Sequence, residues 1–421
     1  MADIYANADV TIFADAASNP HKGIFDSSNE KVSDWFEGAY SRQEELVRLP
    51  VYSSRCAAVS ELFASPNVGG HPLNSQSLLG RRAWAFQEEV LSRRRLRYTS
   101  HGIIWECSAV HYGCCEAEPH AIHNVERDRS SMVSRALYQI PFEPLATRWT
   151  YGSLPDAGDA TINWWYLQIN VYTTRRLTRS EDRFPALSGL AKEYSDRTGY
   201  EYKAGIWVND FRRGLLWSSV GGSTDTRYSP SWSWAVVAGA EPGQHVYSYG
   251  MWCWDHIAGN EVELVGLSVE HIGGAPFGQV ALPAKLMLRG LCRSIKELWC
   301  ANNFYFLASR FGRRYEGPNC LKVCYEREHG KISLWMDDQD DTLEDFWARK
   351  DPFILQIARF DYFDCNYYSG KQARVQKEAS FGLVLERVPG ADDWYRRIGI
   401  AEMPDDGSEE LGWEMKTLTI I

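Results

Sequence analysis

The sequence has no long hydrophobic run and no excess of positive charge. No apolar stretch reaches the 18 residues that suggest a membrane-spanning helix, and the opening MADIYANADV lacks the basic region and apolar core of a secretory signal. The formal net charge is −10. This disfavours a general nucleic-acid binder, because such a protein needs a basic surface to neutralise phosphates. We therefore expect a soluble cytoplasmic protein whose partners include neither nucleic acid nor a membrane.

The sequence also lacks the short motifs of the common cofactor and metal enzymes. It contains no phosphate-binding loop, dinucleotide fingerprint, nucleophile elbow, kinase signature or HExxH pattern. Residues 101–123 are rich in His and Cys, but their spacing fits no tetrahedral zinc template. The acidic run 337–346 lacks the glycine and the spacing of a calcium loop. We therefore expect no metal and no cofactor.

Aromatic residues are abundant, and the pattern of the chain changes about half-way along it. The sequence contains 17 Trp, 22 Tyr and 17 Phe, which suit thick cores or an aromatic-lined pocket. Helical patterns occur mainly in the first half, whereas short apolar runs separated by Gly, Pro, Asn and Asp follow from about residue 205. The prediction is an α+β protein, with a mainly helical N-terminal domain containing a few strands (1–200) and a β-rich C-terminal domain, sandwich or barrel-like (201–421).

The segment GRRAWAFQEEVLSRRR (80–95) reads as a helix with an unusual polar pair. At 100° per residue, its apolar side chains span an arc of roughly 160°, with Gln87 inside the arc and Glu88 at its edge beside Trp84. A buried amide needs partners, so Gln87 is interpreted as a tie to a neighbouring loop. Glu88 is a candidate general acid or base; the alternatives are a salt bridge to Arg81 or Arg82, or a plain surface carboxylate. The basic run 93–97 is interpreted as cations that complement the helix C-terminus.

Two tryptophan pairs form the second candidate binding feature. Read as strands, WSW and WCW place alternate tryptophans on one face, where they would form either a slot for a flat apolar ligand or simply core. An acid and an imidazole follow the second pair and would suit proton transfer at the rim. The residues concerned are Trp232, Trp234, Trp252 and Trp254, with Asp255 and His256 as catalytic candidates.

Several segments together resemble the heterokaryon-incompatibility (HET) domain family of filamentous fungi. IYANADVTIFADAASNPHKGIF (4–25) is similar to an early stretch of that domain, and RAWAFQEEVLS (82–92) resembles its most diagnostic motif. Further similarity lies in WEC (105–107), DRFPALSGLA (182–191), YKAGIWVNDFRRGLLW (202–217) and PSWSWA (230–235), and more weakly in SFGLVLERV and YRRIGI near the end. The family's usual upstream portion, similar to TIR domains, has no counterpart in this sequence. We therefore expect either a truncated domain or a specialised relative.

The resemblance implies a role in fungal non-self recognition and cell-death signalling, in which the β-rich half would sense a protein partner or inhibit the domain. The alternative is a cofactor-independent enzyme of secondary metabolism, such as a cyclase, isomerase or dehydratase. This enzyme would hold a small apolar or aromatic ligand in a pocket and use a carboxylate for proton transfer.

Overall fold

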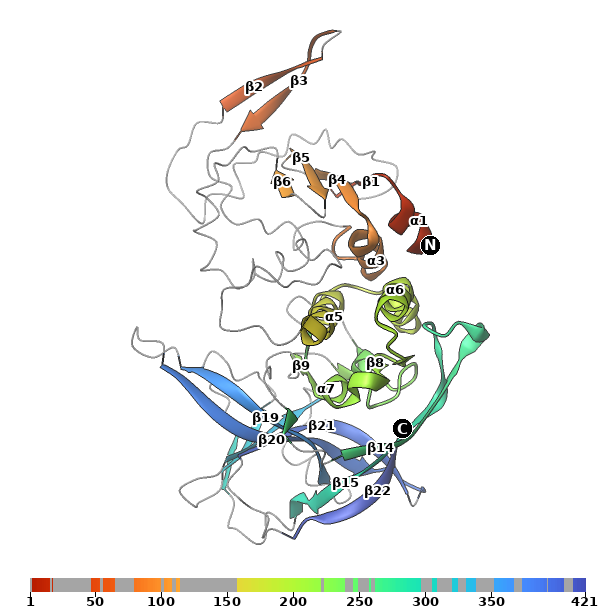
Figure 1. Ribbon diagram of the computed structural model, residues 1–421, viewed down its shortest axis with the longest axis vertical. Coiled ribbons are helices and arrows are strands. Elements are labelled where there is room, and N and C mark those ends of the chain that lie inside the picture. Colours follow the sequence, from red (N-terminus) through yellow and green to blue (C-terminus); the bar gives the residue numbers. More distant parts are fainter. Residues whose placement is uncertain are drawn as a thin grey trace. The chain divides into compact units, whose positions relative to one another are not determined.

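The chain divides into two compact units, residues 1–145 and 146–421. The predicted domain boundary at residue 200 therefore lies inside the second unit. Figure 1 shows the computed structural model with its elements labelled. The structure describes residues 2–15, 17, 47–53, 56–64, 79–99, 102–107, 111–113, 157–220, 223–238, 245–248, 257–258, 262–296, 305–308, 320–324, 331–337, 352–366, 373–391, 393–404 and 412–421.

In the described residues of the first unit there are two short helices and a four-stranded sheet of order β1-β4-β5-β6. β1 runs parallel to β4, whereas the other neighbours are antiparallel. A separate hairpin is formed by β2 and β3. The bounds are α1 (Ala2–Asn7), β1 (Thr11–Phe13), β2 (Val47–Ser53), β3 (Cys56–Ala64), α3 (Ala83–Leu91), β4 (Arg94–Thr99), β5 (Gly102–Cys107) and β6 (His111–Gly113).

The basic run 93–97 does not end the helix, so its interpretation as helix-terminal cations is wrong. The helix α3 ends at Leu91 and contains no basic residue in its last turn. Strand β4 begins three residues later and alternates exposed and buried arginines, with Arg94 exposed and both Arg95 and Arg97 buried. An arginine that alternates into a sheet interior needs acidic or carbonyl partners there.

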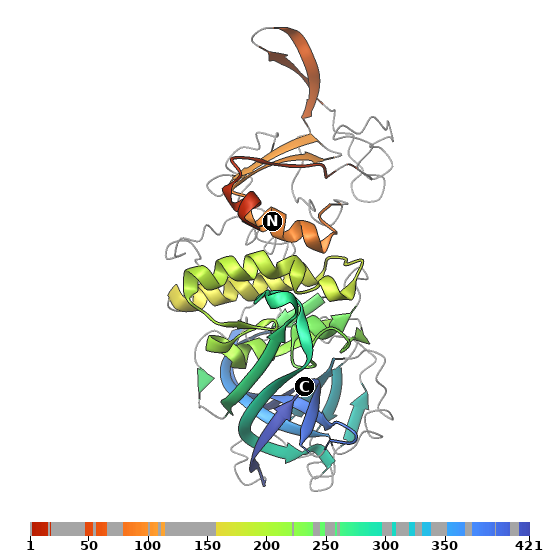
Figure 2. The ribbon, with the colours of Figure 1, turned by 90° about the vertical axis from the view of Figure 1, so that its right-hand side faces the viewer.

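The helices of the second unit form a layer of their own. Figures 1 and 2 both show α5 and α6 side by side, with α7 and β8 between them and the large sheet. A short 3-10 turn begins at Pro185, and Gly199 ends α6 in the left-handed conformation, at φ 71°. The bounds are α5 (Ala157–Thr173), η3 (Ser180–Asp182), η4 (Pro185–Leu187), α6 (Ser188–Thr198), η5 (Val208–Asp210), α7 (Phe211–Leu215), η6 (Trp234–Val236) and η8 (Ile272–Gly274).

Aromatic rings fill this helical layer. Trp165 of α5, Tyr194 of α6 and Trp207 of β8 are fully buried. Their ring centroids lie 5.5 Å (Trp165–Tyr194), 4.9 Å (Trp165–Trp207) and 4.6 Å (Tyr194–Trp207) apart. These distances correspond to direct ring contact, so much of the aromatic excess in the sequence is core.

The large sheet contains ten strands. β19 pairs β15, β15 pairs β22, β22 pairs β21, β21 pairs β20, and β20 pairs β19 again. These five pairings close a ring, and the remaining strands extend from it. The bounds are β13 (Ile257–Ala258), β14 (Val262–His271), β15 (Val280–Ser294), β16 (Tyr305–Ala308), β17 (Cys320–Cys324), β18 (Lys331–Met336), β19 (Phe353–Asn366), β20 (Ala373–Arg387), β21 (Trp394–Pro404) and β22 (Glu414–Ile420).

Smaller strand pairs connect the helical layer to this sheet. They are β7 (Tyr202–Lys203) with β8 (Ile206–Trp207), β9 (Trp217–Val220) with β12 (His245–Ser248), and β10 (Ser223–Thr224) with β11 (Val237–Ala238). The β-rich C-terminal half is therefore confirmed. Before residue 200 the described residues include both helices and strands, so the mainly helical first half stays a prediction. No helix in the described ranges is both long enough and apolar enough to cross a bilayer.

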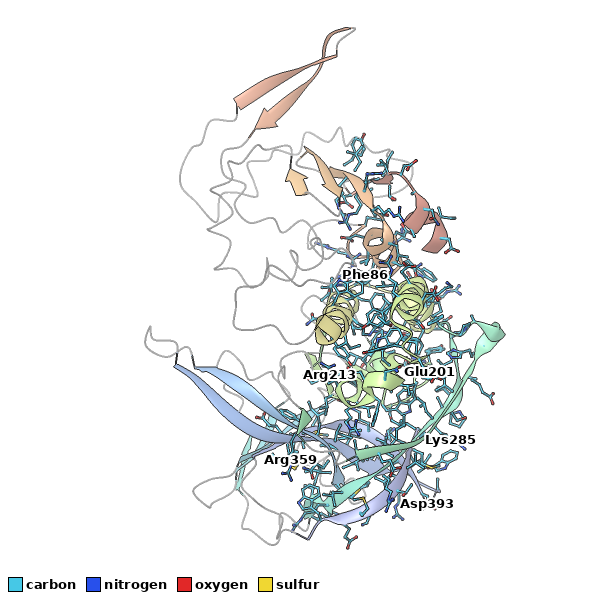
Figure 3. All side chains as sticks on the ribbon, in the orientation of Figure 1. Phe86, Glu201, Arg213, Lys285, Arg359 and Asp393 are labelled. Carbon is cyan, nitrogen blue, oxygen red and sulfur yellow. The ribbon has the colours of Figure 1, made fainter. Side chains whose placement is uncertain are left out.

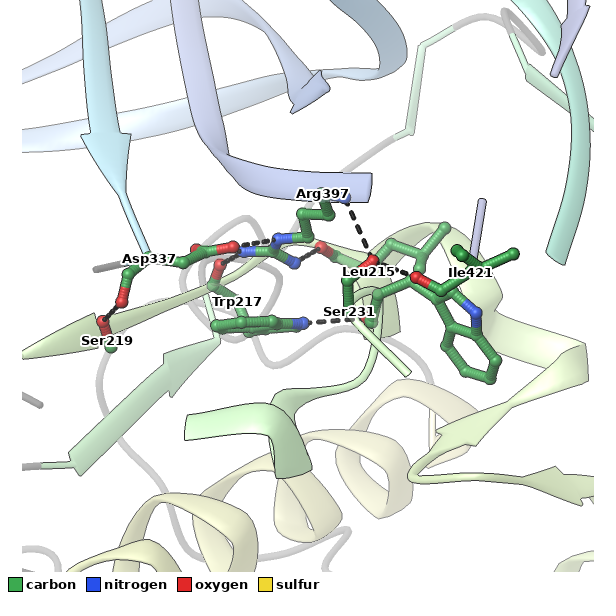
Figure 4. A network of polar contacts seen from close by, with 8 residues as sticks. Leu215, Trp217, Ser219, Ser231, Asp337, Arg397 and Ile421 are labelled. Atoms are coloured by element: carbon green, nitrogen blue, oxygen red, sulfur yellow. Dashed lines mark hydrogen bonds and ion pairs between the residues drawn. The ribbon is translucent and has the colours of Figure 1, made fainter. Parts of the chain in front are cut away.

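A buried arginine joins the pieces of the second unit. Arg397 of β21 binds Asp337 through Nε to Oδ2 at 2.9 Å and through Nη2 to Oδ1 at 3.0 Å. Its Nη1 donates to the Leu215 carbonyl at 2.7 Å, and its Nη2 donates to the Trp217 carbonyl. The guanidinium also lies over the Trp217 ring, 3.4 Å from the centroid. Figure 4 shows that this one side chain links β21, the end of β18 and the α7–β9 connection.

The main chain of Arg397 continues the same network. Its N–H donates to Ser231 Oγ at 3.0 Å. Ser231 in turn donates from its N–H to the Ile421 carbonyl at 3.1 Å and also bonds it through Oγ. The loop before η6, strand β21 and the end of β22 are therefore held at one point (Figure 4).

We expect Arg397→Met to lower the free energy of unfolding by about 3–5 kcal/mol, because Asp337 would remain buried without its cation. Urea unfolding of the purified chain measures this loss. The control is Lys192→Met on α6. Lys192 and its partner Asp196 are both exposed, so the loss of this pair is expected to cost less than about 1 kcal/mol. Equal losses in the two variants would contradict the role given to Arg397.

Candidate functional site

Helix α3 is buried on more sides than its sequence pattern suggests. Gln87 is buried, as the helical arc predicts, and Glu88 lies half-buried at the rim. Glu89, which the arc places on the polar side, is only 3% exposed. Conversely, Val90 and Trp84 are half-buried, although the arc places both on the apolar side. The helix therefore presents Glu89 to the interior as well as its apolar side chains.

Glu88 is the described carboxylate of this helix that could take part in proton transfer. Partial burial raises the pKa of its carboxyl group, and this effect outweighs a hydrogen bond from Tyr5 and the nearby charge of Arg82, which both lower it. Tyr5, on α1, has its own pKa raised by burial and by the neighbouring carboxylate. A half-buried carboxylate with a raised pKa and a hydroxyl partner can donate or accept a proton.

Glu89 belongs to a buried ionic cluster centred on Arg97. Arg97 Nη2 lies 2.7 Å from Glu89 Oε1, and Arg97 Nη1 lies 2.9 Å from Asp15 Oδ2. The side chains of all three residues are at most 4% exposed. The guanidinium also lies over the Phe13 ring, 4.8 Å from its centroid. A cation held by two carboxylates and a ring, away from water, positions three segments of chain rather than a reactant.

Further hydrogen bonds hold the same three segments together. Arg95 Nη1 donates to the Glu89 carbonyl at 2.7 Å. Ser92 Oγ, just after α3, bonds Thr11 Oγ1 of β1 at 2.7 Å and the Glu88 carbonyl at 2.6 Å. The helix is thus fixed to β4 through Glu89 and to β1 through Ser92 at its C-terminal end. These contacts set the position of Glu88 on the rim.

The sequence contains a pattern that points to this cluster, but the helical periodicity of α3 alone does not reveal it. The periodicity places Glu89 opposite the apolar arc, where solvent is the default expectation. The alternation of Arg95 and Arg97 in the following strand is the feature that points to buried acidic partners. Asp15 could not be paired with Arg97 from sequence, because the contact spans 82 residues.

The tryptophans of WSW are core residues, and the strand expected for them is wrong. Residues 231–233 form a turn, and Ser233 caps the 3-10 helix η6 by accepting from the Ala235 N–H. Trp232 Nε1 donates to the Ala284 carbonyl at 3.4 Å, whereas Trp234 Nε1 donates to the Gly205 carbonyl at 2.7 Å. Because Trp232 bonds to strand β15 and Trp234 bonds to the turn between β7 and β8, the two rings do not line one slot.

The rings around Trp234 confirm that it packs as core. Its centroid lies 6.0 Å from that of Tyr172 and 6.2 Å from that of Phe184, with both pairs edge-on. Trp232 and Trp234 are 0% and 3% exposed. The other predicted residues, Trp252, Trp254, Asp255 and His256, lie outside the described residues. Among the residues that are described, no three His, Cys, Asp or Glu side chains gather as a metal site would require.

Comparison with known proteins adds no relative: no protein-family model, curated protein or solved structure matches the chain.

We expect two neighbouring substitutions in α3 to behave differently. Glu89→Gln should lower the free energy of unfolding by about 1.5–3 kcal/mol, because it removes a charge-assisted contact to buried Arg97. Glu88→Gln should leave the protein folded, because the half-buried amide can still form hydrogen bonds with water and with the Tyr5 hydroxyl. Urea unfolding of both variants at neutral pH tests this contrast. A larger loss from Glu88→Gln would show that the rim residue, rather than the buried one, holds the helix.

Stability should depend on pH through Glu88. Its folded-state pKa lies above the ordinary 4.5, so the folded protein binds this proton more tightly than the unfolded chain does. Wild-type stability contributed by this group is therefore lost as pH rises from about 4.5 through the folded-state pKa, whereas Glu88→Gln shows no such loss. The free energy of unfolding should be measured for both proteins between about pH 4 and about pH 8. The value for Glu88→Gln should rise relative to that of wild type with increasing pH, and the difference should become constant above the folded-state pKa.

The companion variant is Tyr5→Phe. The hydrogen bond from Tyr5 lowers the pKa of Glu88. Its removal should therefore raise this pKa further and extend to higher pH the range over which the stability contributed by Glu88 is lost. Parallel curves for wild type and Glu88→Gln would contradict the shifted pKa.

Proposed function

We propose that the chain is a cytoplasmic HET-like protein that acts in fungal non-self recognition and cell-death signalling. The observation that carries the proposal is the way in which the resembling segments contact one another. In the first unit, segment 4–25 supplies Asp15 and segment 82–92 supplies Glu89, and both bind Arg97. Two of the resembling segments thus meet at one buried cation, which supports reading them as parts of one domain rather than as scattered similarities.

The second unit repeats this arrangement with other segments of the same resemblance. Segment 202–217 supplies the Leu215 and Trp217 carbonyls that Arg397 binds, and 230–235 supplies Ser231. Arg397 itself belongs to the weakly similar YRRIGI. We further propose that residues 1–200 are mainly helical and that the closed ring of strands gives the C-terminal half a barrel-like character. On this view the β-rich part senses a protein partner or restrains the first unit.

The second candidate is a cofactor-independent enzyme, and one observation favours it. Glu88 has the half-buried position, raised pKa and hydroxyl neighbour of a proton-transfer group. Its substrate would be a small apolar or aromatic molecule, because half-buried Trp84 lies one helical turn before Glu88 on α3.

Induced expression in a filamentous fungus tests the signalling role. We expect strong expression to arrest growth, and Trp84→Ala to relieve the arrest because it removes the half-buried ring on the rim of α3. The control is Trp394→Ala, another half-buried tryptophan, in the second unit. It should remain toxic when the two variants accumulate to the same level. Vigorous growth at high wild-type abundance would contradict the proposal.

The variant Glu88→Gln separates the two candidates. For a signalling protein it should retain at least part of the toxicity, since the buried cluster of Glu89, Arg97 and Asp15 is untouched. For an enzyme it should abolish turnover while the protein remains folded, because the amide cannot exchange a proton. A metabolite profile that differs between hosts expressing wild type and Glu88→Gln would favour the enzyme.

A further inference from the structure

Residues 267–285, the end of the β14–β15 hairpin, extend beyond the large sheet as a two-stranded arm. β15 pairs with β22 only from Leu286 onward. Before that residue, β14 is its partner among the described strands. The turn of the arm is closed by the Ile272 N–H, which donates to the Gln279 carbonyl at 2.8 Å. Figures 1 and 2 both show the arm alongside the helical layer.

The base of the arm is fixed to the rest of the second unit by hydrogen bonds. Arg212 Nη2 of α7 donates to the Val262 carbonyl at 2.8 Å, and Trp232 Nε1 donates to the Ala284 carbonyl at 3.4 Å. Val262 and Ala284 are 1% and 0% exposed. Neither donor titrates near neutral pH, so this end of the arm stays in place when the pH changes over that range.

The tip of the arm packs against strand β7. The ring centroid of Phe277 lies 5.7 Å from that of Tyr202, with an interplanar angle of 33°. Tyr202 is 5% exposed, and its ring also contacts Trp207 at 4.9 Å. Phe277 is half-buried, and Val280, which follows the turn, is buried. The tip therefore covers one edge of the aromatic core, and its departure would uncover Tyr202.

The tip contains an ionisable side chain, His271, at the end of β14. The imidazole is half-buried, and its Nδ1 atom is buried without a hydrogen-bond partner among the described residues. The charge of Lys203, on β7, acts on this imidazole. Lys203 itself pairs with Glu201 at 3.2 Å. Figure 3 labels Glu201, which lies just before β7, and Lys285, which lies on the arm. A proton on His271 would add a second cation to this contact.

The other described groups around His271 do not offset this cation. Glu270, the preceding residue of β14, is exposed and points to the opposite face of the arm. Val280, opposite His271 in the register, is apolar. Burial and the Lys203 charge lower the pKa of His271 below its ordinary 6.5, and the opposite effect of the Gly278 carbonyl is smaller.

We propose that the arm is a pH-sensitive clamp, docked on β7 while His271 is neutral and released at its tip when His271 is protonated. A neutral imidazole can keep its unprotonated nitrogen at the buried Nδ1 position, where no donor then lacks a partner. A protonated imidazole carries an N–H donor on both nitrogens, so it would bury an unpaired charged donor near the Lys203 ammonium. Movement of the tip into water removes both costs, while the hydrogen bonds at the base remain.

The direction of the pH dependence follows from the lowered pKa of His271. The docked imidazole binds its proton more weakly than the released one, so docking is at full strength above about pH 6.5. Docking weakens as the pH falls from there through the docked-state pKa, and it then becomes constant. The clamp thus couples acidification to exposure of Tyr202. This inference rests on the arm alone and on neither candidate function.

Fluorine NMR on the full chain, with 4-fluorophenylalanine in place of Phe277, tests the clamp between about pH 8 and about pH 5. The difference in fluorine shift between H₂O and D₂O measures how far the ring is exposed to water. We expect this difference to grow as the pH falls, toward the value in Tyr202→Ala, where the ring contact is absent at every pH. The control label replaces Phe353, a half-buried ring 5.0 Å from Tyr395 in the large sheet. Its exposure should stay constant. A Phe277 label that ignores pH, or a Phe353 label that becomes exposed with it, would overturn the proposal.

Variants identify the titrating group. His271→Gln binds no proton, so the label at Phe277 should stay shielded from water at every pH. Lys203→Met removes the ammonium that disfavours the protonated imidazole, so its response to pH should be smaller than that of wild type. The matched control is Lys192→Met, which removes an exposed lysine of α6 and should respond as wild type does. A response that persists in His271→Gln, or that is the same in Lys203→Met as in Lys192→Met, would overturn the clamp.

Discussion

The structure of the second unit depends on one buried ion pair, Arg397 with Asp337. A guanidinium removed from water is costly unless its donors are satisfied, and here a carboxylate, two carbonyls and a tryptophan ring surround it. The carboxylate lies at the end of β18, whereas both carbonyls and the ring come from the α7–β9 connection. The requirement to satisfy one cation therefore fixes how β21, β18 and the α7–β9 connection meet, which non-directional apolar packing alone would not specify.

The first unit uses the same physical device on a smaller scale. Arg97 joins Asp15 and Glu89, and the aromatic ring of Phe13 covers the guanidinium. Hydrophobic burial there is limited, because the described elements are two short helices and a narrow sheet. Directional, charge-assisted contacts then decide where α3 lies against β1 and β4. The candidate residue Glu88 owes its half-buried position to this anchoring of its neighbour.

Glu88 and Glu89, which follow Gln87 on α3, show how far periodicity in the sequence can predict burial. Helical periodicity correctly gave Gln87 a buried position and Glu88 a rim position. It failed for Glu89, since periodicity describes a helix with one buried face, whereas α3 has partners on more than one side. The same limit applies to WSW, where the strand pattern was wrong. Ser233 caps a 3-10 helix there, and its two neighbouring tryptophans bond to β15 and to the turn between β7 and β8.

Local signals in the sequence determined the parts of this protein that depend on neighbouring residues. Gly199 ends α6, and many of the short apolar runs after residue 205 become strands, because backbone conformation responds to residues a few positions away. Only the tertiary structure decided which charges are buried and which strands close the ring. The Arg397–Asp337 pair joins residues 60 positions apart, and Arg97–Asp15 joins residues 82 positions apart. No periodicity encodes such pairs, since they exist only when the chain brings a cation and an anion together away from water.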